Sequence, residues 1–204
     1  MSSQPLNRYD RRKRETRSRI REAATDLFAE QGYEATKVAD ICEQADVARQ
    51  TFFNHFPAKR DVLRELFDIG VDFMEGLLEA ACQRGATTRE RLALYFGDTM
   101  ESAVTVGPFS RDLVAHVVHA NQDESELRQA QRISALFHRL VEIGVAHGDV
   151  TRRYQPAVLA HLVEGAMVNL MRDWSVTGGF DPLERAAQVA SLVADALEKR
   201  PDES

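Results

Sequence analysis

Apolar residues recur at the spacing of an α-helix along most of this chain, and no segment alternates apolar and polar residues as a half-buried strand does. The first stripe runs from Ile20 through Leu27 and Phe28, and Gly32 supplies a helix end after it. Pro57 stops a much shorter helical pattern, because proline has no amide hydrogen for the backbone ladder. The pattern therefore predicts an all-α fold.

Later helices show the same spacing, with proline or glycine at their ends. Pro156 and Pro182 each follow a polar residue and stand at the first position of a predicted helix, where proline is favoured. Thr36 is predicted to cap the second helix. The predicted helices after the first span residues 38–45, 48–56, 57–84, 88–105, 109–120, 124–147, 156–176 and 182–198.

With 204 residues, the chain is long enough for one medium or two small domains. No apolar run is long enough to span a bilayer, and the basic N-terminus lacks the apolar segment of a secretory signal, so we expect no membrane contact. Cys42 and Cys82 stand far apart, which predicts a reducing, cytoplasmic setting without structural zinc. We find no motif of a catalytic or phosphate-binding site, and we predict no catalytic residue, no cofactor and no metal site.

The net charge of −6 is unevenly distributed. Residues 1–60 carry 12 lysines and arginines against 9 acidic residues, whereas residues 61–204 carry 14 against 23. The basic excess is greatest in residues 8–21, where eight basic residues stand beside Asp10 and Glu15. This asymmetry predicts a cationic N-terminal module on an acidic body, with a solvated charged helix as the alternative.

Two short helical patterns joined by a tight turn occupy residues 38–56. In the second pattern Phe52 and Phe56 are four residues apart and share an inward face, which leaves Arg49 and Gln50 facing outward. A helix this short is not stable by itself, so its neighbours must hold it. Two such helices, the second with a polar, cationic and aromatic outer face, predict a helix-turn-helix whose second helix fits the DNA major groove.

The sequence of residues 36–63, TKVADICEQADVARQTFFNHFPAKRDVL, resembles the signature of the TetR family of bacterial transcription regulators. The positions in register are Thr36, Ile41, Ala45, Val47, Phe52, His55, Phe56, Lys59 and Leu63. The resemblance implies a three-helix DNA-binding domain at residues 1–60 with a basic N-terminal arm at 11–17. It also implies a helical ligand-binding and dimerisation domain at residues 61–204.

Four residues of the helix-turn-helix depart from the family pattern, and one of them, Cys42, replaces a common alanine. Asp46 stands where the family usually has glycine, and aspartate tolerates a left-handed backbone better than most residues. Ala48 replaces a serine or threonine that would cap the next helix. Phe53 replaces a tyrosine and so lacks its hydroxyl. These departures bear on the details of DNA contact and leave the predicted fold intact.

By the resemblance, Arg49, Gln50 and Thr51 face the bases, where arginine suits guanine and glutamine suits adenine. Phe53 is expected to contact a thymine methyl or the sugar backbone. The resemblance places Thr36, Lys37, His55 and Lys59 at phosphates, and phosphate contacts set the register of the protein on DNA without reading the base sequence. Surface or bracing roles are the alternative. The predicted DNA-binding residues are Thr36, Lys37, Arg49, Gln50, Thr51, Phe53, His55 and Lys59.

The last two predicted helices are apolar on more than one side, which predicts a four-helix bundle between two copies of the chain. The resemblance implies the same, and an ordinary monomeric core is the alternative. The predicted dimer residues are Leu159, Leu162, Val163, Met167, Leu170, Ala187, Ala190 and Ala194.

The resemblance further implies an effector pocket among the middle helices, although the same residues are also ordinary candidates for the core. The candidates for contact with the effector are Phe73, Phe96, Met100, His116, Phe137 and Trp174. His116 and His119 share one predicted helix and would make half of a metal site, but the sequence offers no third ligand at suitable spacing.

Together these features predict a homodimeric DNA-binding transcription regulator, a repressor released from a near-palindromic operator by a small molecule. One alternative is an activator of the same fold. A second is a helical small-molecule-binding protein, or an enzyme, with an incidental helix-turn-helix.

Overall fold

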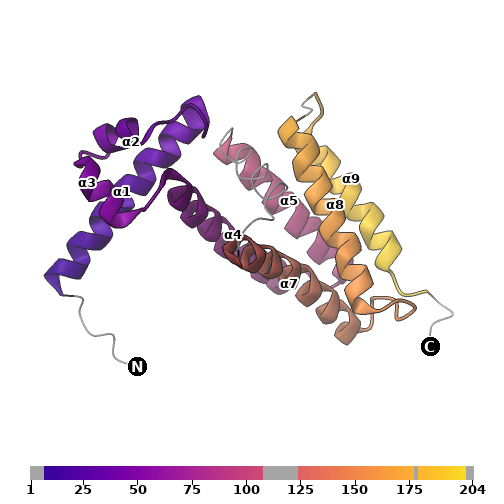
Figure 1. Cartoon of the computed structure of the whole chain (residues 1–204). Helices are drawn as coiled ribbons and strands as arrows, with labels where there is room; N and C mark the ends of the chain where they lie inside the picture. Colours follow the sequence, from indigo (N-terminus) through magenta and orange to yellow (C-terminus); the bar gives the residue numbers. More distant parts are fainter. Residues whose placement is uncertain (1–6, 108–123, 177–178, 201–204) are drawn as a thin grey trace. The chain divides into compact units, whose positions relative to one another are not determined.

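The computed structural model describes residues 7–107, 124–176 and 179–200, and these are helical apart from short connections (Figure 1). The all-α prediction is confirmed. The predicted helix at 109–120 lies outside the described residues. The described helices are α1 (Arg8–Gln31), α2 (Val38–Gln44), α3 (Arg49–His55), α4 (Lys59–Arg84), α5 (Thr88–Val106), α7 (Glu124–His147), α8 (Pro156–Val176) and α9 (Pro182–Leu197).

The chain divides into two compact units, Met1–Phe67 and Asp68–Ser204, and the boundary falls inside α4. The first unit contains α1, α2, α3 and the beginning of α4. Each of the helices α1 to α4 contributes to its core. The core side chains with no exposed surface are Ile20, Ala24, Phe28, Ile41, Phe52, Phe56 and Val62. The burial of both Phe52 and Phe56 confirms the inward face predicted for α3.

The first helix begins earlier than its apolar stripe suggests, at Arg8, with the Asn7 side chain accepting a hydrogen bond from the Tyr9 amide at 2.6 Å. The basic stretch at 11–17, which was predicted as an N-terminal arm, is therefore part of α1. Arginine, lysine and glutamate are good helix formers. An exposed helix built of them has no apolar stripe to reveal it, so periodicity missed about three turns before Ile20.

Backbone conformation at the turns follows the residue types. Gly32 ends α1 with φ +84°, and Asp46 between α2 and α3 takes φ +50°, the left-handed conformation predicted from its place in the turn. The helix begins at Val38 as predicted, but the prediction that Thr36 caps it was wrong, because the residue directly before the helix is Lys37. The cap position belongs to Lys37, whose amide donates to Asp40 Oδ2 at 3.0 Å.

The second unit is a helical bundle in which α5 packs on α9 and α7, and α8 packs on α7 and α9. Figure 1 shows α5, α8 and α9 running beside one another, with α8 and α9 adjacent. As predicted, Pro156 and Pro182 begin α8 and α9, and Asp181 caps α9 by accepting from the amides of Leu183 and Glu184. The Thr151 amide donates to the Leu197 carbonyl at 2.8 Å, which ties the loop after α7 to the end of α9.

Continuing the stripe of Val62 and Leu66 along α4 predicts that Phe73, a candidate for the effector pocket or the core, points inward, but its side chain is 52% exposed. Val62 and Leu66 are buried within the first unit, and Phe73 continues their line along the helix. Within the second unit α4 instead buries Val71 and Leu78, roughly on the opposite side at about 100° per residue. The prediction failed because it carried one stripe through a helix that buries a different face in each unit.

Candidate nucleic-acid interface

The outward face of α3 presents hydrogen-bonding and aromatic side chains to solvent. Arg49 and Gln50 are exposed, and the Phe53 ring is 43% exposed. Thr51 is half-buried beside them. The Phe53 ring meets the buried Phe52 ring edge to face at a centroid distance of 5.4 Å, and its exposed side is available to a partner.

Asn54 belongs to the same surface and was missed in the sequence analysis. It is exposed, and its Oδ1 accepts a hydrogen bond from Gln50 Nε2 at 3.1 Å. The signal that would have revealed it is its spacing of four residues from Gln50, which places the two side chains on one helix face. The pair holds two amide groups together, and amides can read adenine edges.

Arg17 of α1 holds the C-terminal end of α3. Its Nη1 donates to the His55 carbonyl at 2.7 Å, and its guanidinium lies 4.1 Å from the centre of the Phe56 ring. A cation at a helix C-terminus is stabilising, because the last carbonyls carry partial negative charge. Glu65 of α4 accepts from Arg17 Nε at 2.7 Å and from Arg21 at 3.2 Å. These contacts keep the short helix in place while its other face stays exposed.

Thr36 and Lys59, which were predicted to contact phosphates, form hydrogen bonds within the loop between α1 and α2. The Thr36 hydroxyl is buried and donates to the Gly32 carbonyl at 2.8 Å. Lys59 Nζ donates to the carbonyls of Tyr33 and Thr36 at 2.5 and 2.8 Å and lies over the Tyr33 ring. Thr36 uses its hydroxyl hydrogen in this way and Lys59 uses two of its three ammonium hydrogens, whereas the Lys37 side chain is exposed.

His55, at the last position of α3, is half-buried. Burial, together with the positive charges of Arg17 and Lys13, lowers the pKa of its imidazole below the ordinary value. Its Nδ1 has no hydrogen-bond partner among the residues that the structure describes. The ring therefore stays neutral near pH 7 in the free protein.

The predicted effector residues separate into three groups in the structure. Phe96 and Met100 of α5, Phe137 of α7 and Trp174 of α8 are buried in the second unit. Phe73 is exposed, as described above, and His116 lies outside the described residues. The Phe137 ring meets the Tyr95 ring edge to face at a centroid distance of 6.0 Å, so α5 and α7 share an aromatic contact.

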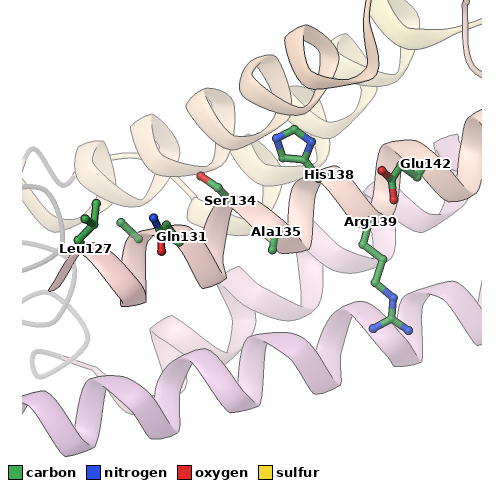
Figure 2. Close-up of a pocket in the computed structure, with 8 residues that line it drawn as sticks. Leu127, Gln131, Ser134, Ala135, His138, Arg139 and Glu142 are labelled. Carbon is green, nitrogen blue, oxygen red and sulfur yellow. The ribbon is translucent and has the colours of Figure 1, made fainter. Parts of the chain in front are cut away.

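An open groove of about 690 Å³ runs along α7, and the described residues that line it all come from that helix (Figure 2). Of the predicted effector residues that the structure describes, none lines this groove. Beside it, the Ser134 hydroxyl donates to the Glu164 carboxylate of α8 at 2.8 Å, and the His138 and His161 rings lie 6.0 Å apart. The lining residues are Leu127, Ala130, Gln131, Ser134, Ala135, His138, Arg139 and Glu142.

Most of the predicted dimer residues are buried within their own chain. These are Leu159, Val163, Met167, Leu170, Ala190 and Ala194, each at most 4% exposed. Leu162 and Ala187 are exposed and remain available to a second copy. Four further large apolar residues of α8 and α9 are exposed: Val158, Val176, Leu183 and Leu192.

Within residues 7–107, 124–176 and 179–200, no three histidine, cysteine or acidic side chains lie close enough together to hold a metal ion. The described part of the chain also has no helix that is both long and apolar enough to cross a membrane.

Residues 20–66 match the family described as bacterial regulatory proteins, tetR family. The chain is 25% identical over 171 residues to the fatty acid metabolism regulator protein of Bacillus subtilis (strain 168), covering 80% of this chain and 86% of the relative. It is 26% identical over 191 residues to the HTH-type transcriptional repressor DhaR of Mycobacterium sp. (strain GP1), covering 89% and 91%. Residues 20–66 of this chain belong to the TetR family.

The TetR-family match begins at Ile20 in α1 and ends at Leu66 in α4, so it contains the whole helix-turn-helix. A likeness of fold extends much further. The crystal structure of the transcriptional regulator FadR from Bacillus subtilis in complex with stearoyl-CoA has a TM-score of 0.73 and 19% identity to this chain. It covers 89% of this chain and 99% of that one. The helices of the second unit therefore have the architecture of a TetR-family C-terminal domain.

Proposed function

We propose that this protein is a homodimeric transcription repressor that binds operator DNA through α3 and is released by a small molecule bound in its second unit. The observation that carries the proposal is the outward face of α3, where Arg49, Gln50, Phe53 and Asn54 are exposed on a helix whose other face is fully buried. The family match and the relative named as a repressor support it.

In this proposal each side chain on α3 has a chemical role. Arg49 donates two hydrogen bonds to guanine, and the Gln50–Asn54 pair presents amides to adenine, each good contact contributing about 1–3 kcal/mol of discrimination. Phe53 packs on a thymine methyl group. Lys37 and His55 contact phosphates, while Thr36 and Lys59 position the loop that carries α2.

A single short helix reads only a few base pairs, so the proposal requires two copies. Two recognition helices related by a two-fold axis read a near-palindrome when they enter successive major grooves about 34 Å apart. We place the dimer contact on five exposed apolar residues of α8 and α9, namely Val158, Leu162, Leu183, Ala187 and Leu192. As a DNA-binding regulator, the protein acts in the cytoplasm.

The effector we propose is a long-chain acyl thioester. One relative is named a fatty acid metabolism regulator, and a solved structure of the same fold holds stearoyl-CoA. The second unit of this chain buries apolar and aromatic side chains suited to an acyl tail, including Phe96, Met100, Phe137 and Trp174. Because α4 contributes to both units, we propose that this helix transmits effector binding to the DNA-binding unit. If substitutions at residues 57–66 leave release by effector intact, this role of α4 is wrong.

The DNA-binding proposal is tested by mobility shift of the purified protein on its own upstream DNA across a salt series. The wild type should give a specific shift that weakens steeply with salt, because phosphate contacts release counterions. Arg49→Ala should weaken specific binding by about 1–3 kcal/mol, roughly 5- to 150-fold.

The matched control for this experiment is Arg139→Ala, which removes the same charge from an exposed position of α7 in the second unit. It should leave the shift nearly unchanged. Equal losses in both variants would mean that the effect is one of overall charge, and α3 would then not be the reading helix.

A further inference from the structure

Three polar side chains of α5 are buried without satisfying all their hydrogen-bonding atoms. Tyr95 Oη, Thr99 Oγ1 and Arg91 Nη1 have no partner among the residues that the structure describes. The three residues are at most 5% exposed. Burying a polar atom without a partner is costly, and native proteins contain few of them. Three on one helix therefore require an explanation.

The helix geometry places these three residues in one line along α5. Arg91, Tyr95 and Thr99 are successive positions four residues apart, so they share one face of α5 and span about 12 Å of its length at 1.5 Å per residue. Arg91 lies nearest the N-terminal end of α5 and is held in place, because its Nε and Nη2 donate to the carbonyls of Gly85 and Ala86, each at 3.0 Å. Only its Nη1 is left without an acceptor.

The surroundings of this line are apolar. Phe96 and Met100 follow Tyr95 and Thr99 by one position each and have no exposed surface. The Phe137 ring of α7 packs edge to face on the Tyr95 ring. Burial raises the pKa of the Tyr95 phenol, so its hydroxyl keeps its proton at neutral pH. Both hydroxyls, as well as Arg91 Nη1, can therefore donate hydrogen bonds, and the matching ligand group is an acceptor oxygen in an apolar molecule.

We propose that the hydroxyls of Tyr95 and Thr99 donate to the carbonyl oxygen of the effector's acyl group, which binds against α5 beside Phe137. A carbonyl oxygen has two lone pairs and so satisfies two donors at once. This inference rests on the proposed function, because it assigns the polar contact of the effector site in the second unit. The proposed site on α5 is separate from the groove along α7, because neither Tyr95 nor Thr99 lines that groove.

The test compares stearoyl-CoA with its thioether analogue, S-octadecyl-CoA, which has the same chain and nucleotide but no carbonyl. The full-length protein is used as wild type, Tyr95→Phe and Thr99→Val, with binding measured by calorimetry and by release from DNA. Tyr154→Phe is the matched control, because Tyr154 is 51% exposed. The wild type should prefer the thioester, and each hydroxyl deletion should weaken thioester binding about 3- to 10-fold while changing thioether binding little.

Thermal unfolding without ligand provides a second readout. A hydroxyl that lacks a partner in the free protein costs stability, so Tyr95→Phe and Thr99→Val should unfold at the same temperature as the wild type or a few degrees higher, by about 2–4 °C. A lower unfolding temperature would mean that the hydroxyls have structural partners, which would overturn the inference.

Failure of this inference is distinguishable from failure of the proposed function. If the wild type is released from DNA by stearoyl-CoA and both variants keep its preference for the thioester, the carbonyl contact is wrong and the effector class stands. If the wild type does not bind stearoyl-CoA at all, the acyl effector is wrong, and the carbonyl contact is overturned with it.

Discussion

His55 shows how a single residue in the DNA-binding unit couples local packing to pH. Its carbonyl is bound by Arg17, and its imidazole lies near the charges of Arg17 and Lys13. Burial is the larger cause and the two positive charges the smaller causes of its lowered pKa. Protonating this ring in the folded protein is therefore harder than protonating it in the unfolded chain.

The consequence is a loss of stability in acid. Because the folded-state pKa is lower than the ordinary value of 6.5, His55 stabilises the fold above that value and loses this contribution as the pH falls through and below it. The free energy of unfolding should therefore fall less for His55→Gln than for the wild type between pH 7.5 and pH 5.5. Urea unfolding at both pH values measures this difference, and identical pH dependence in the two proteins would contradict the assignment.

Asp46 shows what residue type alone can predict. Its short polar side chain tolerates the left-handed region, and the turn requires that conformation at its position, as φ +50° shows. The cap of α2 was less predictable, because both Thr36 and Lys37 precede the apolar stripe. The Thr36 hydroxyl turns back to Gly32, and that choice depends on a loop conformation that neighbouring residues do not encode by themselves.

At the scale of elements, α3 is a seven-residue helix with no side-chain cap at its N-terminus. Ala48 occupies the cap position and offers no oxygen to the first amides of the helix. Packing of Phe52 and Phe56, along with Arg17 at the other end, supplies the stability that the missing cap does not.

Restoring the cap should stabilise the protein. Ala48→Ser adds a hydroxyl that can accept from an orphan amide, and we expect a gain of about 1 kcal/mol. The free energy of unfolding is measured by urea denaturation, with the circular dichroism signal of the helices as the probe. Ala93→Ser, in the exposed middle of α5, is the control and should give no gain, because serine has no capping role there.

At the scale of the whole molecule, the apolar residues left exposed on α8 and α9 require a partner. Leu192 is 69% exposed, Val158 54% and Leu162 46%, although the opposite faces of both helices are buried in the chain's own core. Two copies meeting through these faces would bury them and would also supply the second recognition helix.

Leu162→Glu should dissociate the dimer, because it places a charge in an apolar contact. Light scattering after size exclusion should show a monomer, and operator affinity should fall about 100-fold as the second half-site is lost. Leu127→Glu on α7 is the matched control, since Leu127 is also an exposed leucine at 56%. If both variants remain dimers, the contact lies elsewhere on the chain.

The sequence by itself determined the class of fold, most helix ends and the inward face of α3, because these depend on interactions within a few turns. Proline at the start of α8 and α9, glycine after α1 and the spacing of Phe52 and Phe56 act locally. The same locality explains the family resemblance at residues 36–63, where the helix-turn-helix is continuous in sequence.

Only the tertiary structure decided which apolar stripe faces which neighbour. The sequence is equally consistent with Leu159, Val163 and Met167 as dimer contacts or as core residues. Packing of α8 on α7 and α9 buries them within one chain. Phe73 is exposed because α4 buries different faces in its two units. The unpaired hydroxyls of Tyr95 and Thr99 were equally hidden, because a missing hydrogen-bond partner is a property of everything around a residue and not of its place in the chain.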